Sequence, residues 1–287
     1  MADVLFPVSL DQALDLLAKT EAPAVLAGGT DLLVQVRQGK KTPGIFVSLD
    51  RIEGAQEILE TETEIIIRAG APLARIMAHP AIRDHGSVLA QALAVLGSPQ
   101  IRNMGTLGGN IMTASPAGDS LPPLYALDAR VQLAGPEGFR RMPVRDFIQG
   151  PGKTALAPGE ILWQANFTKP APGTCHWFEK VGQRTALSIS MVSLAALFRP
   201  DPDGRVSKVS LAWGSVGPTI VESPETETFL LNKPLTREVL AGAGDLARQA
   251  VRPISDIRAT ADFRRQVAGN LLMRLETPAK GKRLTRY

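Results

Sequence analysis

Apolar residues recur at helical spacing near the N-terminus of this chain. Ser9 precedes them in the position of an N-cap, so the pattern predicts a short amphipathic helix from Ser9 to Lys19, with one apolar face made of Leu10, Ala13, Leu14 and Leu17. AVLAGGTD follows and predicts a strand that enters a loop; GIFVSLD and EIIIRAG are short apolar runs further along. Bounded by glycine, proline and charges, they predict buried strands and a first lobe rich in strands.

The middle of the chain alternates a helix with further strands. A helix is predicted from His85 to Leu96, because Val88, Leu89, Ala92 and Val95 share one face, and it ends at the Gly97–Pro99 break. The segments RVQLAG, RRMPVRDF and EILWQANF predict strands separated by turns. KPAPG, residues 169–173, has the composition of a linker and predicts a domain boundary near Lys169.

Beyond the linker the pattern predicts a second, smaller unit. The segments TCHWFEKVG, MVSLAALFRP and RVSKVSLAWGSV predict three strands, the last two joined by a turn at DPDG. Two helices are expected near Thr236–Ala247 and Asp262–Leu275. The second helix is expected to carry one apolar stripe of Phe263, Val267, Leu271 and Leu275, spaced i, i+4.

Composition narrows the class of protein. Hydrophobic residues make up 44% of the 287-residue chain and charged residues 21%, as in soluble globular proteins. The net charge is +4, and the tail KGKRLTRY alone contains four basic residues, so the rest of the chain has no basic excess. We interpret this tail as a solvated end or a docking arm. The chain has no internal stripe of basic and aromatic residues, so its composition does not indicate nucleic-acid binding. The N-terminus lacks a signal peptide and no 18-residue apolar run occurs, so we expect a cytoplasmic protein.

Two glycine pairs are the candidate binding elements. They lie in LAGGTDLL, residues 26–33, and in GTLGGNIMTAS, residues 105–115. Adjacent glycines allow positive φ and close approach of a ligand to the main chain, where successive N–H groups converge on an anion. Each alone is typical of a structural turn, but together they suit a pyrophosphate. Neither has the lysine of a P-loop nor the spacing of a Rossmann fingerprint.

Five segments in order carry a resemblance to a known family. They are LAGGTDLL, GSPQIRNMGTLGGNIMTASPAGDSLPPLYALDA, GPGKTALAPGEIL, FEKVGQRTALSIS and SDIRATADFRR. The chain resembles the FAD-binding medium subunits of the xanthine dehydrogenase and carbon monoxide dehydrogenase family of molybdenum hydroxylases. The resemblance implies an α+β fold with two domains. Residues 1–170 would form a FAD-binding domain of the vanillyl-alcohol oxidase (PCMH) type, with two lobes at about 1–55 and 56–170. Residues 174–287 would form a smaller domain.

The resemblance also assigns site residues. The pyrophosphate and flavin edge would lie along Ala27, Gly28, Gly29, Thr30, Asp31 and Leu32, with the Asp31 carboxylate turned to solvent or to a neighbouring amide. The second segment would complete the cradle with Thr106, Gly108, Gly109 and Asn110, and would approach the flavin with Met112 and Thr113 and the phosphates or ribityl chain with Ser115.

Three further positions complete the implied FAD site. Asp119 would bind the adenosine ribose hydroxyls, although its sequence context also fits a helix cap or turn. Leu162 would pack on the isoalloxazine ring, and Lys180 would lie at the ring's polar edge or, alternatively, on a strand surface. None of the residues assigned near the flavin is a histidine or cysteine, so we expect non-covalent FAD.

Other reactive residues lack the pattern of a site. His79, His85 and His176 have no metal-ligand spacing, and the first two are expected in exposed loops. Cys175 and His176 are neighbours on a predicted strand and so point to opposite faces. Trp163 and Trp177 are expected in the core or an interface. We therefore assign no catalytic side chain and no metal site.

The single cysteine excludes an intrachain disulfide and a four-thiolate iron-sulfur cluster. By resemblance, a partner small subunit carries two two-iron clusters and a large subunit carries molybdopterin, in a dimer of heterotrimers. FAD here would pass electrons to NAD, oxygen or a quinone carrier. Two segments resemble subunits of the xanthine dehydrogenase type more than those of the carbon monoxide dehydrogenase type: IQGPGKTALAPGEIL and GSVGPTIVESPE. Alternatives are a carbon monoxide, aldehyde or N-heterocycle dehydrogenase subunit, a stand-alone flavoprotein oxidase, or a scaffold without cofactor.

Overall fold

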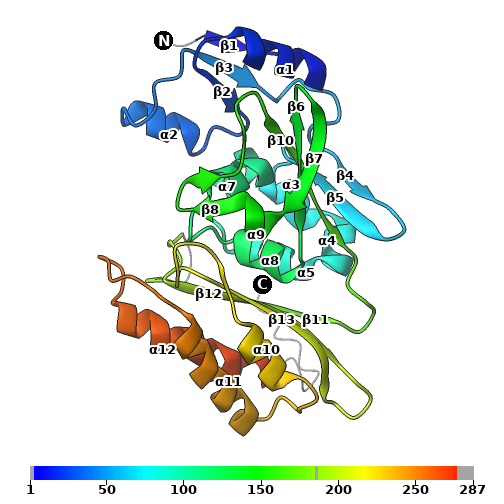
Figure 1. Cartoon of the computed structure of the whole chain (residues 1–287), viewed down its shortest axis with the longest axis vertical. Helices are drawn as coiled ribbons and strands as arrows, with labels where there is room; N and C mark the ends of the chain where they lie inside the picture. Colours follow the sequence, from blue (N-terminus) through cyan, green and yellow to red (C-terminus); the bar gives the residue numbers. More distant parts are fainter. Residues whose placement is uncertain (1–2, 185–186, 277–287) are drawn as a thin grey trace.

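The computed structural model describes residues 3–184 and 187–276. They form three larger β-sheets stacked along the long axis and one two-stranded sheet (Figure 1). The basic tail falls outside these residues. The first sheet is parallel, in the order β1-β3-β2, with strands Asp3–Leu5, Ile45–Ser48 and Pro23–Leu26. Helices α1 (Leu10–Lys19) and α2 (Leu32–Arg37) accompany it.

Helix α1 forms as its sequence predicts. The Ser9 hydroxyl accepts a hydrogen bond from the Gln12 N–H and caps the first turn. Ala13 and Leu17 are buried against Val47 of β3 and its neighbours in a small core. The local pattern and the tertiary packing therefore agree here.

The second sheet is antiparallel, in the order β4-β5-β10-β6-β7, with strands Ile58–Glu60, Glu64–Arg68, Ile161–Thr168, Arg130–Gly135 and Gly138–Pro143. Glu64–Arg68 therefore belongs to this sheet and not with the N-terminal strands. The strand predicted over Arg140–Phe147 ends at Pro143, where the chain turns into α9 (Val144–Phe147). A two-stranded ribbon follows, made of β8 (Ile148–Gly150) and β9 (Lys153–Thr154).

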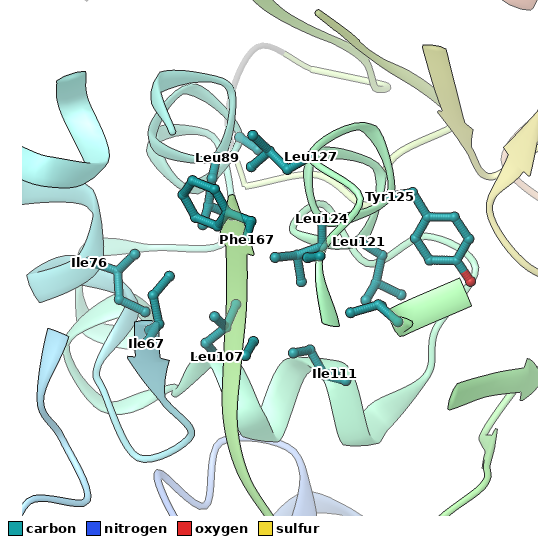
Figure 2. Packing of buried hydrophobic residues seen from close by; sticks show 14 of the residues in the cluster. Ile67, Ile76, Leu89, Leu107, Ile111, Leu121, Leu124, Tyr125, Leu127 and Phe167 are labelled. Atoms are coloured by element: carbon teal, nitrogen blue, oxygen red, sulfur yellow. The ribbon is translucent and has the colours of Figure 1, made fainter. Parts of the chain in front are cut away.

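Short helices pack with this sheet into one core, in which Leu107 and Ile111 of α7 face the same interior as Phe167 of β10 (Figure 2). They are α3 (Leu73–Ala78), α4 (Pro80–His85), α5 (Ser87–Ala94), α6 (Pro99–Met104), α7 (Leu107–Thr113) and α8 (Leu121–Ala126). The helix predicted from His85 to Leu96 is shorter because Gly86 separates α4 from α5. A side chain at Gly86 would lie 2.8 Å from the Phe167 ring, so the break allows close packing.

The C-terminal sheet is antiparallel, in the order β11-β12-β13-β14, with strands Cys175–Val181, Val192–Pro200, Val206–Gly214 and Val221–Glu222. The two-residue β14 adds to the three predicted strands. Alternate residues of β12 face different cores: Ala195 and Leu197 pack with the core of the five-stranded sheet, whereas Leu194 and Ala196 pack under the C-terminal helices. Burial on both faces explains its continuous apolar sequence.

Helices α10 (Pro224–Leu230), α11 (Arg237–Ala250) and α12 (Ala261–Leu271) cover that sheet, and a 3₁₀ turn follows at Leu272–Leu275. The apolar stripe predicted for α12 is wrong at its start, because Phe263 is 44% exposed. The neighbouring Arg264 is buried in its place, and Leu271 and Leu275 are buried as expected. Within the described ranges, none of the helices has the length and apolar content needed to cross a bilayer.

Candidate functional site: a two-part pocket beside the glycine segments

A pocket of about 840 Å³ lies between the N-terminal sheet and the five-stranded sheet. Such a volume falls in the upper part of the range of about 300–1,000 Å³ that is typical of ligand sites. Every residue expected to bind FAD lines it except Ser115, Asp119 and Lys180. The fold therefore brings the two glycine segments to one cavity.

The first glycine segment connects β2 to α2 and presents unused donors. Gly29 has φ +67°, a left-handed conformation that favours glycine. Within residues 3–184 and 187–276, no acceptor takes a hydrogen bond from any backbone N–H of Gly28–Leu32. Five successive free N–H groups beside a cavity are available to donate hydrogen bonds to an anion bound there.

The Asp31 carboxylate does not occupy this anion site. Its Oδ2 accepts from Gln35 Nε2 at 2.6 Å and from Thr113 Oγ1 at 3.0 Å. The expectation that it turns to a neighbouring amide is confirmed, and the second bond ties the first segment to α7.

The second glycine segment is largely helical rather than a loop. Gly108 and Gly109 lie in the first turn of α7, and neither has positive φ. Gly108 N–H donates to Ala69 O at 2.9 Å, and Gly109 N–H donates to Thr106 Oγ1 at 3.1 Å. These two donors are therefore bonded within the protein, unlike the N–H groups of the first segment.

These two glycines nevertheless shape the pocket. A Cβ at Gly108 would lie 2.5 Å from the Ala69 Cβ, so the residue allows α7 to approach the segment after β5. A Cβ at Gly109 would meet only the Thr106 hydroxyl, at 3.1 Å, and otherwise open space. Gly109 therefore leaves room inside the cavity.

A second pocket, of about 440 Å³, adjoins the first and holds two of the remaining expected residues. The two pockets share Leu96, Ile101 and Asn110 as lining residues. Ser115 and Asp119 line the second pocket, together with Leu187–Ile189 from the C-terminal domain. The Ser115 hydroxyl accepts from Ala117 N–H at 3.3 Å within its own turn.

Lys180 reaches this second pocket through Asp119. The Lys180 Nζ lies 2.5 Å from Asp119 Oδ2 and also donates a hydrogen bond to Val95 O at 3.2 Å. The side chains of Lys180 and Asp119 are each less than 9% exposed. Burial raises the pKa of Asp119 to about 6, and the Lys180 ammonium limits the rise. Asp119 Oδ1 is buried without a partner among the described residues, so it can accept a hydrogen bond from a ligand.

This ion pair joins two residues for which the sequence predicts separate roles. Asp119 was assigned to the adenosine ribose and Lys180 to the flavin edge, at opposite ends of the dinucleotide. In this structure the two charged groups lie 2.5 Å apart. The pairing spans 61 residues of sequence, and no local pattern indicated it.

Sequence reasoning missed part of the pocket wall. Leu156–Ile161, between β9 and β10, line the first pocket, and Arg140 holds this segment by bonding both oxygens of Glu160 at 2.5 and 2.7 Å. Arg140 also donates to Ala155 O at 2.7 Å. The motif GPGKTALAPGEIL contained the signal, but only Leu162 was taken from it.

The other reactive side chains lie away from both pockets. Cys175 and His176 line neither; His176 accepts from Val88 N–H at 3.4 Å, and burial lowers its pKa to about 4. His79 and His85 are partly buried at the ends of α3 and α4, not in exposed loops. Trp163 and Trp177 are buried in the cores, as expected.

Comparison with known proteins decides the family. Residues 1–167 match the family described as the FAD binding domain in molybdopterin dehydrogenase, and residues 177–278 match the CO dehydrogenase flavoprotein C-terminal domain. The chain belongs to the xanthine and carbon monoxide dehydrogenase family as an FAD-binding medium subunit. The family supports the α+β fold and FAD as the cofactor.

Similar proteins act on different substrates. The chain is 30% identical to a nicotinate dehydrogenase FAD-subunit of Eubacterium barkeri, over 94% of this chain and 93% of that protein. It is 32% identical to a putative xanthine dehydrogenase FAD-binding subunit of Escherichia coli (strain K12), over 89% and 88% of the two chains. A solved structure of reconstituted CO dehydrogenase from Oligotropha carboxidovorans superposes with TM-score 0.93 at 29% identity, covering 98% of each chain.

Proposed function

We propose that this medium subunit binds FAD non-covalently across both pockets and relays electrons within a molybdenum hydroxylase complex. The observation that carries the proposal is the row of free backbone N–H groups from Gly28 to Leu32 beside the large cavity. A pyrophosphate needs such donors and no cluster of lysines. Neither pocket, among the residues described, contains a histidine or cysteine that would link a flavin covalently.

The two pockets divide the dinucleotide. The first pocket is lined by the parallel N-terminal sheet and the five-stranded sheet, and we assign the adenosine half to it. The second is bordered by the partly exposed Ile101, Leu187 and Ile189, where a redox-active ring is within reach of another chain. We therefore assign Asp119 and Lys180 to the flavin half, and Leu162 to the adenosine half.

Bound FAD supplies redox chemistry that couples two-electron and one-electron carriers. The chain's own residues hold and tune it. With FAD bound, the buried Lys180 ammonium would favour negative charge at the polar edge of the ring, and the unpartnered Asp119 Oδ1 would be available to accept a hydrogen bond from the cofactor. Leu96 and Ile101, shared by the pockets, give the junction an apolar surface.

The remaining machinery belongs to other subunits. One cysteine cannot supply the usual four thiolates of a cluster, and within the described part of the chain no group of three or more histidines, cysteines or carboxylates could hold a metal ion. Electrons therefore arrive from a partner. We infer a small subunit with two two-iron clusters and a large molybdopterin subunit, in a dimer of heterotrimers.

We propose a xanthine dehydrogenase type of complex in the cytoplasm, on the motifs IQGPGKTALAPGEIL and GSVGPTIVESPE. Nicotinate and carbon monoxide dehydrogenases are the alternatives, since relatives of each kind have similar identity. The acceptor is NAD, oxygen or a quinone carrier. Assaying the assembled complex with hypoxanthine, nicotinate and carbon monoxide distinguishes these substrates.

The relay is tested by substrate-driven bleaching of the flavin absorption. The purified chain loaded with FAD should show no bleaching with any of these substrates, and the chain co-expressed with its neighbouring subunits should bleach with one of them. Bleaching by the isolated chain would instead identify a stand-alone flavoprotein oxidase. A purified chain that cannot bind FAD would indicate a scaffold.

A further inference from the structure

Arg264 is a buried cation of the C-terminal domain that lines neither pocket. It lies on α12 and is only 4% exposed. One terminal guanidinium nitrogen donates to Met191 O at 2.8 Å and to Ser215 O at 3.0 Å, and the other donates to Asp256 Oδ1 at 2.7 Å. The guanidinium thus joins the start of β12, the residue after β13 and the segment before α12.

Ser215 carries this contact to the second pocket. Its N–H donates to Pro116 O at 2.8 Å, and its hydroxyl donates to Ser190 O at 3.0 Å. Pro116 lies between Ser115 and Ala117, which line the second pocket, and Ser190 follows the lining residue Ile189. One residue therefore bonds to both of these segments of the pocket wall.

The backbone of Ser215 needs support to do this. Its φ is +65°, a left-handed conformation that side chains other than glycine adopt at a cost. The carbonyl of this residue is the one that Arg264 holds. A glycine would adopt the conformation more easily, but it would lose the hydroxyl that binds Ser190.

Asp256 fixes the guanidinium from the other side. Its Oδ1 also accepts from the N–H groups of Arg258 at 2.8 Å and Ala259 at 3.2 Å, and its Oδ2 accepts from the Arg258 guanidinium at 2.9 Å. These bonds lower the pKa of Asp256, so it stays charged and keeps Arg264 oriented. Charge-assisted bonds of this kind are stronger and more directional than neutral ones.

We propose that Arg264 is a positioning residue for the flavin half of the cofactor site, acting through Ser215 on the segments 115–119 and 187–190. This inference rests on the proposed function, in which the second pocket takes the flavin half. It assigns the C-terminal domain a part in cofactor binding beyond the side chains that face the pocket.

The test compares ligands that report on the two pockets separately. Full-length protein freed of flavin is titrated with FAD, with FMN for the second pocket and with ADP for the first. In Arg264→Lys and Ser215→Ala we expect the Kd for FAD and FMN to rise at least about tenfold, as loss of one buried bond allows. The Kd for ADP should change by less than about twofold.

Arg265→Lys is the matched control, because Arg265 is the next residue and pairs with Asp262, whose side chain is 91% exposed. Ser215→Gly separates strain from positioning: it should bind FMN as weakly as Ser215→Ala while unfolding at a higher temperature than that variant. Equal weakening of FMN and ADP would show a merely structural role and overturn the proposal, as would control-like FMN binding in the Ser215 variants.

The outcome for unaltered protein distinguishes the two levels of inference. If it fails to bind FAD, the proposed function is wrong. If it binds FAD, FMN and ADP and the variants bind all three like the control, only the role of Arg264 is wrong.

Discussion

Gly28 lies against the backbone of Met104 with no room for a side chain: a Cβ at Gly28 would lie 2.6 Å from the Met104 carbonyl carbon and 3.0 Å from Gly105 Cα. The contact joins the first glycine segment to the end of α6, directly before the second segment. Thr113 reinforces it by donating to Asp31. The two segments therefore form one wall because backbone packs on backbone.

We predict that Gly28→Ala destabilises the protein by about 3 kcal/mol and abolishes FAD binding, because the methyl group meets rigid main chain rather than a flexible side chain. Thermal unfolding of the flavin-free protein and FAD titration would measure both effects. Gly150→Ala is the matched control, since a Cβ there meets nothing within 4 Å and its φ is not positive. A Gly28→Ala variant as stable as this control would refute the contact.

Gly109→Val should remove FAD from a chain that stays folded. Positive φ is not the reason, because Gly109 is helical; the valine side chain instead enters the cavity, where only the Thr106 hydroxyl lies nearby. We expect FAD affinity to fall about tenfold to hundredfold, with a smaller loss for Gly109→Ala. Equilibrium titration measures this, and unchanged affinity in the valine variant would mean that the ligand does not use this part of the pocket.

The Asp119 carboxyl should make stability depend on pH. Its folded pKa of about 6 exceeds the ordinary value of 3.8, so its contribution is favourable below about pH 4 and is lost as the pH rises through about 6. Relative to Asp119→Asn, the unaltered flavin-free protein should lose about 3 kcal/mol between those limits. Urea unfolding from pH 4 to 7.5 measures the difference, and a difference that stays constant would contradict the raised pKa.

The Asp119–Lys180 pair should show strong coupling. Lys180→Met leaves a buried carboxylate without its cation and should cost about 3–5 kcal/mol, whereas adding Asp119→Asn should restore much of that loss. Urea unfolding of the four proteins in the cycle gives the coupling energy. Additive effects of the two substitutions would show that the pair contributes no interaction.

FAD should be released from the protein by acid precipitation, because no histidine or cysteine lines the described pockets. The absorbance of flavin in the supernatant and in the redissolved pellet measures the distribution. Flavin retained on the pellet would demonstrate a covalent bond and direct attention to residues outside these linings.

Local features were predictable from the sequence because they depend on neighbours in the chain. The cap of α1 by Ser9, the strands β6 and β10, and the turn at DPDG follow from spacing and residue type. The residues assigned from the motifs include thirteen that line the first pocket. Short-range rules act within a few residues, so they need no knowledge of the fold.

Only the tertiary structure decided which polar groups of those residues are bonded within the protein and which are free to bind a ligand. The glycines of both segments look alike in sequence, yet the N–H groups of Gly28–Leu32 are free, whereas those of Gly108 and Gly109 are bonded. The Asp119–Lys180 pair spans 61 residues and the Arg264–Met191 contact spans 73. Partners so distant in sequence are set by which strands and helices pack together, and burial then determines which polar atoms must pair and which remain available to a ligand.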